Sequence, residues 1–201
     1  MKAVLSEVPQ YILDWRRTTG ADQWDEMWEG VLHMVPPPNR EHQDLEGALE
    51  RWLRSHWAEP QGNKVYHQIA VSPEGTPRGE WVHNYRTPDL VLLLPGDFGI
   101  DRNEYFAGPP SVVVEIRSPN DETYEKLPFY AEIGVPEVWV IDRDSKAVEM
   151  FGLYEGNYQS QAADDNGWVS SQRTGVQMKA TDSQKLSIQL AGRPETQSVL
   201  P

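Results

Sequence analysis

The sequence predicts an α/β fold in which a mixed central β-sheet is flanked by helices. The first observation is the order of its patterned segments, which is a helix, three strands, a second helix and two further strands. The second is the passage from "SVVVEI" through a helical segment to "EVWVI", in which both strands are almost entirely apolar. Strands of this kind, joined by a helix, pair in parallel inside a sheet. We therefore expect a parallel pair at the centre of the sheet.

The N-terminal part supplies a hairpin and a long amphipathic helix. "DEMWEGVLHMV" (25–35) alternates loosely around Gly30 and predicts a hairpin or a bent strand, and "PPPN" (36–39) breaks the pattern. A helix is predicted over 40–59, followed by Pro60 and Gly62, which end it. Its apolar residues recur near helical spacing, at Leu45, Ala48, Leu49, Trp52, Leu53 and Trp57.

The remaining elements follow from shorter patterns. We expect a strand over 64–72, an exposed loop over 72–81, an apolar strand in "TPDLVLLLPG" and a loop over 97–110. "PNDETYEKLPFYAEIGV" predicts the second helix, with a proline near its first turn and Gly134 as its stop. The turn "RDSK" predicts a hairpin in the last patterned segment, 136–160.

A chain of 201 residues is long enough for one domain with a core, so we expect a single domain over 1–201. Residues 161–201 are expected to form a C-terminal extension with short strands up to "KLSIQL", followed by a frayed tail. The absence of cysteine excludes disulfides and thiolate metal sites. No signal peptide and no apolar run of roughly 18 residues is found, so a cytoplasmic protein without a membrane partner is expected.

The net charge of −13, from 31 acidic and 18 basic residues, weighs against non-specific binding of nucleic acid, which requires a basic face. It does not exclude a nuclease, because a cluster of carboxylates can hold a metal ion that contacts phosphate.

Three acids are predicted next to strand ends. Asp89 precedes "LVLLL", Glu115 closes "SVVVEI" and Asp142 closes "EVWVI", while Lys126 lies in the helix between the last two strands. Neighbouring carboxylates repel each other unless a cation lies between them, and a hard divalent ion takes oxygen ligands. A nearby lysine can orient water or neutralise charge that develops on phosphate. The pattern therefore predicts a metal site in which the buried Glu115 is a ligand.

Simpler interpretations of each residue remain open when it is taken alone. Asp89 can cap a turn, Glu115 can form a salt bridge with Arg117, and Lys126 can be a solvated helix residue. Asp142 has the position of a hairpin turn residue, and a histidine such as His42 on an amphipathic helix is more often a packing residue than a ligand. The functional interpretation depends on these residues occurring together.

The same segments resemble a known family. "TPDLVLLLP", "PSVVVEIRSPND" and "YEKLPFYAEIGVPEVWVID", with "DEMWEGVLHMVPPPNREH" upstream, closely resemble the Uma-type family of "putative restriction endonucleases", a bacterial group within the PD-(D/E)XK nuclease superfamily. The resemblance covers about residues 25–153, which form the family core. It implies a restriction-endonuclease-like fold, in which a mixed central sheet is flanked by helices.

The resemblance also implies a metal site. Asp89 stands for the acid of the "PD" motif and Glu115 for the second acid. Together with the backbone carbonyl of Ile116, these residues would hold Mg²⁺, for which Mn²⁺ can substitute. Arg117 occupies the position of the superfamily lysine, and arginine cannot readily act as a base. In this family a lysine on the following helix takes that role, and Lys126 stands at that position.

Three auxiliary residues complete the candidate site: Glu26 and His42 come from the same resemblance, and Arg117 comes from its place two residues after Glu115. Glu26 in "DEMWEG" matches the family's N-terminal glutamate, and His42 matches its helix-start histidine. The implied function is Mg²⁺-dependent hydrolysis of DNA by an endonuclease, with RNA as another possible substrate. A homodimer would suit cleavage of both strands of a duplex. The alternative is a catalytically inactive nuclease-fold module with a binding or regulatory role, which Arg117 and the net charge favour.

Overall fold

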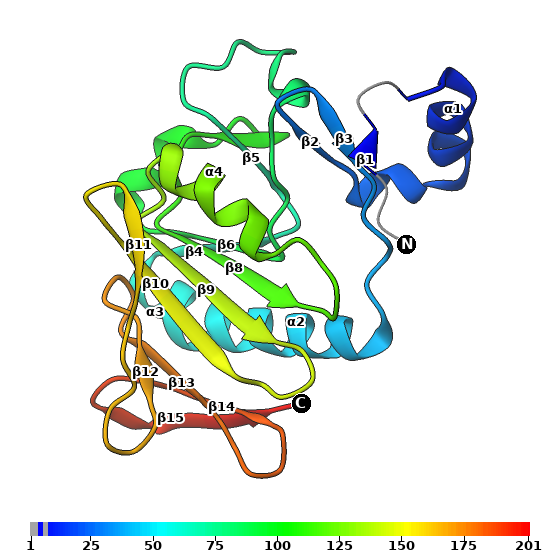
Figure 1. Cartoon of the computed structure of the whole chain (residues 1–201). Helices are drawn as coiled ribbons and strands as arrows, with labels where there is room; N and C mark the ends of the chain where they lie inside the picture. Colours follow the sequence, from blue (N-terminus) through cyan, green and yellow to red (C-terminus); the bar gives the residue numbers. More distant parts are fainter. Residues whose placement is uncertain (1–3, 6–7) are drawn as a thin grey trace.

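The computed structural model describes residues 4–5 and 8–201, and its centre is a six-stranded mixed sheet (Figure 1). The strand order is β11-β10-β9-β8-β6-β4, in which β8 and β9 are parallel and all other neighbours are antiparallel. The expected fold class and its central parallel pair are therefore confirmed. The strands are β4 (Lys64–His67), β6 (Leu90–Leu93), β8 (Val112–Arg117), β9 (Glu137–Asp142), β10 (Val148–Tyr154) and β11 (Asn157–Ser160).

The sheet forks at the end of β8. Strand β6 pairs with β8 only over Leu90–Leu92 against 112–114, whereas β9 pairs with β8 from Val113 to Arg117. The last three residues of β8 therefore run beyond β6, and Asp89 lies where the chain enters β6. This fork places the acid that precedes one strand beside the acid near the end of the next.

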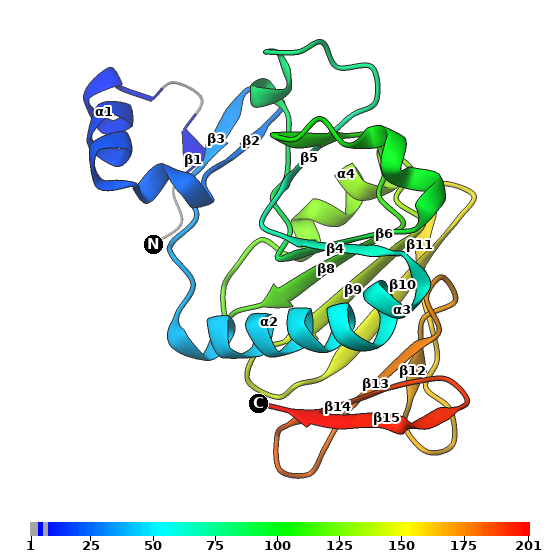
Figure 2. The ribbon, with the colours of Figure 1, turned by 180° about the vertical axis from the view of Figure 1, so that it is seen from behind.

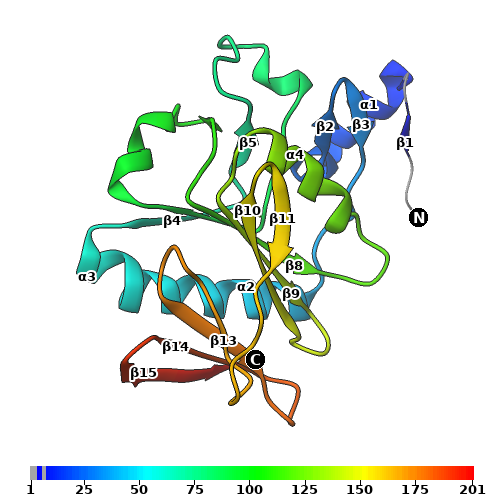
Figure 3. The same cartoon turned by 60° about the vertical axis from the view of Figure 1, so that its left-hand side comes forward.

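Helix α2 (Arg40–Leu53) covers one face of the central sheet, as Figure 3 shows. The side chain of Asn39 accepts a hydrogen bond from the His42 backbone N–H and caps its N-terminus. A π-helical turn (Arg54–Ala58) and α3 (Glu59–Gln61) continue it, and Gly62 ends it in the left-handed region at φ 71°. The predicted apolar face is buried against the sheet, and Leu45, Leu49, Leu53 and Trp57 are fully buried.

The opposite face carries α4 (Leu127–Glu132), which follows a 3-10 turn over Tyr124–Lys126. Pro128 lies in the first turn of α4, where its missing N–H costs no helical hydrogen bond. Phe129 and Tyr130 pack on the valines of β8 and β9 that point to this side, which are Val113, Val138 and Val140. Because side chains alternate along β8, Glu115 points to this face as well.

A second sheet covers the α2 side of the molecule (Figure 2). It contains β12 (Val169–Ser170), β13 (Val176–Ala180), β14 (Leu186–Leu190) and β15 (Arg193–Leu200) in antiparallel order. The frayed tail expected after residue 190 is wrong, because residues 193–200 form β15. Thr196 is buried and its hydroxyl accepts the Leu190 N–H at 2.9 Å, while its carbonyl accepts the indole N–H of Trp52 at 3.1 Å.

The N-terminal region forms a small antiparallel sheet at one end of the molecule (Figure 1). Its strands are β1 (Val4–Leu5), β2 (Glu26–Trp28) and β3 (Val31–His33), and it also carries α1 (Gln10–Thr19) and a 3-10 turn (Ala21–Trp24). The hairpin expected over 25–35 is confirmed as β2 and β3. None of the described helices combines the length and the apolar character required to cross a bilayer.

The segment 64–72 differs from the single strand that its pattern predicts. It splits into β4 and β5 (Ala70–Ser72) at Gln68, whose φ of 49° is in the left-handed region. Strand β5 pairs in parallel with β7 (Tyr105–Ala107), a strand inside the region 97–110 that was expected to be a loop. Two 3-10 segments complete the chain, Trp81–His83 and Pro95–Ile100.

Candidate active site

Glu115 is a buried acid in the interior of the fold. It is 4% exposed, and its position in β8 directs its side chain toward α4. Its Oε1 accepts a hydrogen bond from the hydroxyl of Tyr130 at 2.7 Å, and its Oε2 lies 3.1 Å from Nζ of Lys126. The charge of this carboxylate is therefore balanced by an ammonium group on the segment that begins α4.

Lys126 lies between two acids. Its Nζ is 2.8 Å from Oε1 of Glu26 and 3.1 Å from Oε2 of Glu115, and its side chain is 12% exposed. Glu26 belongs to β2, and its side chain is 2% exposed. Its two oxygens accept hydrogen bonds from the backbone N–H of Thr87 at 2.9 Å and from the indole N–H of Trp28 at 2.8 Å. The β2–β3 hairpin thus supplies the second carboxylate of this ion-pair network.

The electrostatics of the network follow from burial. Burial is the main cause that raises the pKa of Glu115 to about 8, and the nearby acids Asp89 and Glu26 raise it further against the opposing effect of Lys126. Burial alone would lower the pKa of Lys126, but the carboxylates of Glu115 and Glu26 outweigh it and raise that pKa. Lys126 is therefore protonated at neutral pH, and it stays charged in this buried environment.

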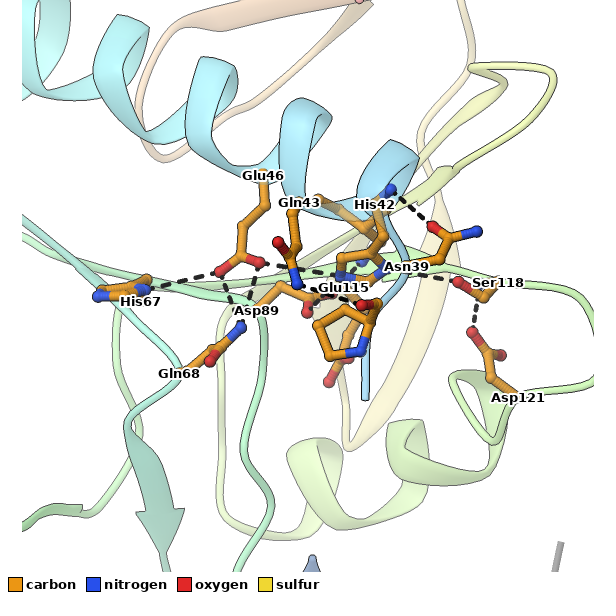
Figure 4. A network of polar contacts seen from close by, with 12 residues as sticks. Asn39, His42, Gln43, Glu46, His67, Gln68, Asp89, Glu115, Ser118 and Asp121 are labelled. Atoms are coloured by element: carbon orange, nitrogen blue, oxygen red, sulfur yellow. Dashed lines mark hydrogen bonds and ion pairs between the residues drawn. The ribbon is translucent and has the colours of Figure 1, made fainter. Parts of the chain in front are cut away.

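Asp89 lies at the fork in the sheet, beside Glu115 (Figure 4). Its Oδ2 accepts the backbone N–H of Ile116 at 2.5 Å, and its Oδ1 is 2.9 Å from Nε2 of His42. The N–H and C=O of a strand residue point to the same edge of that strand. The carbonyl of Ile116 consequently faces the edge at which Asp89 lies, which is the arrangement that a shared ligand set requires.

His42 joins α2 to this region. Its Nδ1 lies 3.4 Å from Oγ of Ser118, in the segment that follows β8. Burial would lower the pKa of His42, but its contact with Asp89 outweighs burial and raises that pKa. A charged or hydrogen-bonded His42 holds the carboxylate of Asp89 in place.

Glu46 is a residue of this region that the sequence analysis missed. It lies four residues after His42 on the same face of α2, and this spacing is the signal that could have identified it. Ligand atoms of His42, Glu46 and Asp89 lie within 4.8 Å of one another, so this group could hold a cation. Burial and the neighbouring Asp89 raise the pKa of Glu46 to about 7, and its oxygens accept hydrogen bonds from the Gln68 amide at 3.2 and 3.3 Å.

Arg117 lies apart from this group in its described contacts. Its guanidinium is 2.9 Å from Oδ2 of Asp142 on β9, and it lies over the ring of Tyr124 at 5.4 Å. The salt bridge that was considered between Arg117 and Glu115 is replaced by this pair. Asp142 also accepts hydrogen bonds from residues of the β9–β10 turn such as Ser145, which agrees with its interpretation as a turn residue.

A cavity of about 570 Å³ opens onto these side chains. It is lined by the proline-rich segment 34–39, by the segment 118–123 after β8, and by Asp89, Glu115 and Lys126. Glu26, His42 and Ile116 also line it, whereas Arg117 does not belong to its lining. The structure therefore brings Asp89, Glu115, Lys126 and the auxiliary residues Glu26 and His42 together around one space, whereas the auxiliary candidate Arg117 and the third predicted acid, Asp142, lie outside its lining.

A family model described as "Putative restriction endonuclease", Uma2, matches residues 8–187. The chain belongs to this family. The resemblance that the sequence motifs indicated is therefore confirmed, and the family match extends on both sides of the expected core, residues 25–153.

A solved structure with a similar fold is that of "a putative nuclease belonging to DUF820" from Anabaena variabilis ATCC 29413. The TM-score is 0.57 at 16% sequence identity, and the match covers 73% of this chain and 80% of that chain. At this identity the likeness establishes the nuclease-like fold. A comparison with curated proteins finds no match.

Proposed function

We propose that this chain is a Mg²⁺-dependent endonuclease that hydrolyses DNA phosphodiester bonds at the site of Asp89, Glu115 and Lys126. Membership of the restriction endonuclease family supports a nuclease. The observation that carries the proposal is the buried ion-pair network of Glu115 and Lys126, which shares one cavity with Asp89. Acids and a lysine buried at this energetic cost cluster at functional sites.

The donor set fits a hard divalent cation. Asp89 and Glu115 supply carboxylate oxygens and Ile116 a backbone carbonyl, which are the ligand types that Mg²⁺ and Mn²⁺ prefer. Glu115 already pairs with the ammonium group of Lys126 at 3.1 Å, so its environment tolerates positive charge. When bound, Mg²⁺ supplies Lewis-acid polarisation of a phosphate and lowers the pKa of a bound water.

The residues of the chain would then divide the remaining work. Lys126 carries a positive charge into the cavity and would stabilise the charge that develops on the scissile phosphate. Glu26 would hold Lys126 from the β2 side, since it contacts Nζ at 2.8 Å. His42 would orient Asp89 from α2, through its contact at 2.9 Å. Arg117 would take no part, because its guanidinium pairs with Asp142.

A catalytically inactive nuclease-fold module is the competing function. It is favoured by the net charge of −13 and by an arginine in place of the superfamily lysine. The position of Lys126 favours catalysis instead, because its ammonium group lies between two buried acids and lines the same cavity as Asp89. RNA is the competing substrate, and parallel assays on the two nucleic acids separate them.

The experiment is cleavage of supercoiled plasmid DNA and of a long RNA by the purified protein, with Mg²⁺, with Mn²⁺ and with EDTA. We expect metal-dependent cleavage of DNA that is lost in Glu115→Gln and Lys126→Ala. The matched control is Glu132→Gln, which removes an exposed acid from α4 and should leave cleavage unchanged. Calorimetric titration with Mn²⁺ should show saturable binding that Glu115→Gln loses and Lys126→Ala retains.

The opposing result is equally clear. Wild-type protein that binds Mn²⁺ and cleaves neither nucleic acid would identify the inactive module.

We further propose a homodimer, because two copies of the site would suit cleavage of both strands of a duplex. Sedimentation equilibrium checks this part, and a monomer at assay concentrations would contradict it.

A further inference from the structure

We propose that Arg86 is a positioning residue that holds Glu26 and Lys126 in the geometry of the active site. This inference rests on the proposed function. The described contacts of Arg86 do not include Asp89 or Glu115, the two acids that line the cavity. Arg86 is 2% exposed and lies three residues before Asp89, in a segment that crosses between the N-terminal sheet and the central sheet.

The guanidinium of Arg86 lies between two aromatic rings. Its Cζ is 4.3 Å from the ring centroid of Trp28 on β2 and 4.1 Å from that of Phe129 on α4. Trp28 also stacks on His33 of β3, with ring centroids 3.8 Å apart. Arg86 therefore joins the hairpin that carries Glu26 to the helix that follows Lys126. A planar guanidinium suits this position, because it can stack on a ring with either face.

Hydrogen bonds determine the orientation of the same group. Nη1 of Arg86 donates to the backbone carbonyls of Met27 at 3.2 Å and Tyr85 at 3.1 Å, and to Oδ1 of Asn84 at 3.1 Å. Nη2 donates to Oε1 of Glu29 at 3.2 Å, where the acid is 66% exposed. The bonds to the carbonyls of Met27 and Tyr85 reach the backbone of β2 and of the segment that follows the 3-10 turn Trp81–His83. They lock the hairpin onto the segment that leads into β6.

Two short routes connect this group to the catalytic lysine. On the hairpin side, the indole N–H of Trp28 donates to Glu26 at 2.8 Å, and Glu26 contacts Nζ of Lys126 at 2.8 Å. On the helix side, Phe129 lies three residues after Lys126, at the first turns of α4. If the guanidinium is removed, both ends of the Glu26–Lys126 ion pair lose the group that aligns them.

The burial of Arg86 is costly for the fold, which supports a role beyond packing. Burial is the main cause that lowers its pKa, and the carboxylates of Glu29 and Glu26 only partly oppose this effect. Its Nε is buried and makes no hydrogen bond with the described residues. Replacement of a buried charged group by an apolar side chain often leaves the stability of a protein unchanged or raises it, so stability alone does not account for a charged group at this position.

The test compares three variants of the full chain in EDTA by NMR of the lysine ammonium groups. In the wild type, the ammonium protons of Lys126 are held by two carboxylates and should exchange slowly with water. The NMR signal of these protons is assigned by its absence from the spectrum of Lys126→Ala. Arg86→Met should raise that exchange rate at least about tenfold, because a displaced Glu26 would no longer form its charge-assisted hydrogen bond with Nζ of Lys126. Arg86→Lys should raise it as well, because an ammonium retains the charge without the stacked plane.

The matched control is Tyr85→Phe. It removes the hydroxyl that donates to the Asp25 carbonyl at 2.9 Å, so it weakens the same hairpin junction without touching the stack. Its exchange rate should equal that of the wild type. A wild-type rate in Arg86→Met, or an equal increase in Tyr85→Phe, would overturn the inference. If Arg86→Met does not fold, Arg86→Lys decides, and a wild-type rate in that variant overturns the positioning role.

Kinetics separate this inference from the proposed function. If the wild type cleaves DNA, Arg86→Lys should lower kcat about tenfold while KM and the Kd for Mn²⁺ stay within about twofold, since it displaces a group that acts in the transition state. An unchanged kcat would contradict the inference and leave the nuclease proposal intact. If the wild type cleaves nothing, the proposed function fails, and the ammonium exchange still decides whether Arg86 positions Lys126.

Discussion

Replacement of Lys126 by methionine removes one positive charge from between two buried carboxylates. The side chains of Lys126, Glu115 and Glu26 are 12%, 5% and 2% exposed, so water screens these charges poorly. Methionine has nearly the same length and retains the apolar contacts of the lysine stem. The variant therefore isolates the electrostatic contribution of the ammonium group to stability.

The magnitude follows from this burial. Removal of one partner of a buried pair costs about 3–5 kcal/mol in the free energy of unfolding, because it leaves an uncompensated charge. Glu115 can relieve part of this cost by binding a proton, since its pKa is already about 8. We expect the loss to lie near the lower end of the range at pH 6, where Glu115 is protonated, and near the upper end at pH 9.

Urea unfolding followed by tryptophan fluorescence, at pH 6 and pH 9 in EDTA, measures this loss. Mn²⁺ at 100 times its Kd should restore about 2.7 kcal/mol by mass action. The control is Lys185→Met, at an exposed position, which should change stability by no more than about 0.5 kcal/mol. A loss below about 1 kcal/mol at pH 9, or an equal loss in the control, would refute the view that Lys126 balances two buried acids.

Three further predictions test the site and the fold. The folded-state pKa of Glu115, about 8, lies above its ordinary value of 4.5, so the wild-type protein in EDTA should lose stability as pH rises between these two values. Glu115→Gln should lack this part of the loss, and urea midpoints that fall equally with pH in both proteins would contradict the prediction. Asp89→Asn retains an acceptor for the Ile116 N–H and should weaken Mn²⁺ binding at least about tenfold, as calorimetry would show, with an unchanged circular dichroism spectrum. Ile188 is fully buried on β14, in the hydrophobic core that the C-terminal sheet shares with α2 and the central sheet. Ile188→Ala should lower the free energy of unfolding in urea by about 2–5 kcal/mol, and a negligible loss would mean that the C-terminal sheet adds little to this core.

The candidate site shows how far residue patterns reach. The sequence indicated Asp89, Glu115 and Lys126 because acids next to apolar strands are unusual and the motifs resemble a nuclease family. Tyr130 and Glu46 were missed, although they lie four residues after Lys126 and His42 and their spacing was a usable signal. Trp28 was also missed, although it lies two residues after Glu26 in a predicted strand and therefore on the same face.

The elements that could be predicted from residue patterns are those whose buried positions recur at a regular spacing. The apolar face of α2, the apolar strands β8 and β9 and the hairpin at β9–β10 follow from periodicity, because each segment must bury the same face wherever it packs. Trp52 and Trp57 were expected on the apolar face of the helix for this reason, and both are buried.

Features that depend on partners distant in the sequence could not be predicted from local patterns and follow from the folded arrangement. Strands β5 and β7 exist because they pair with each other, and β15 is ordered because Thr196 and Leu200 are buried against β14 and the common core. The charge balance of Glu115 also depends on distant residues. Lys126 pairs with Glu115, and the same ammonium group pairs with Glu26 from the N-terminal hairpin. The free energy of a buried charge depends on the groups within a few ångströms of it, and the fold brings those groups together from distant parts of the chain.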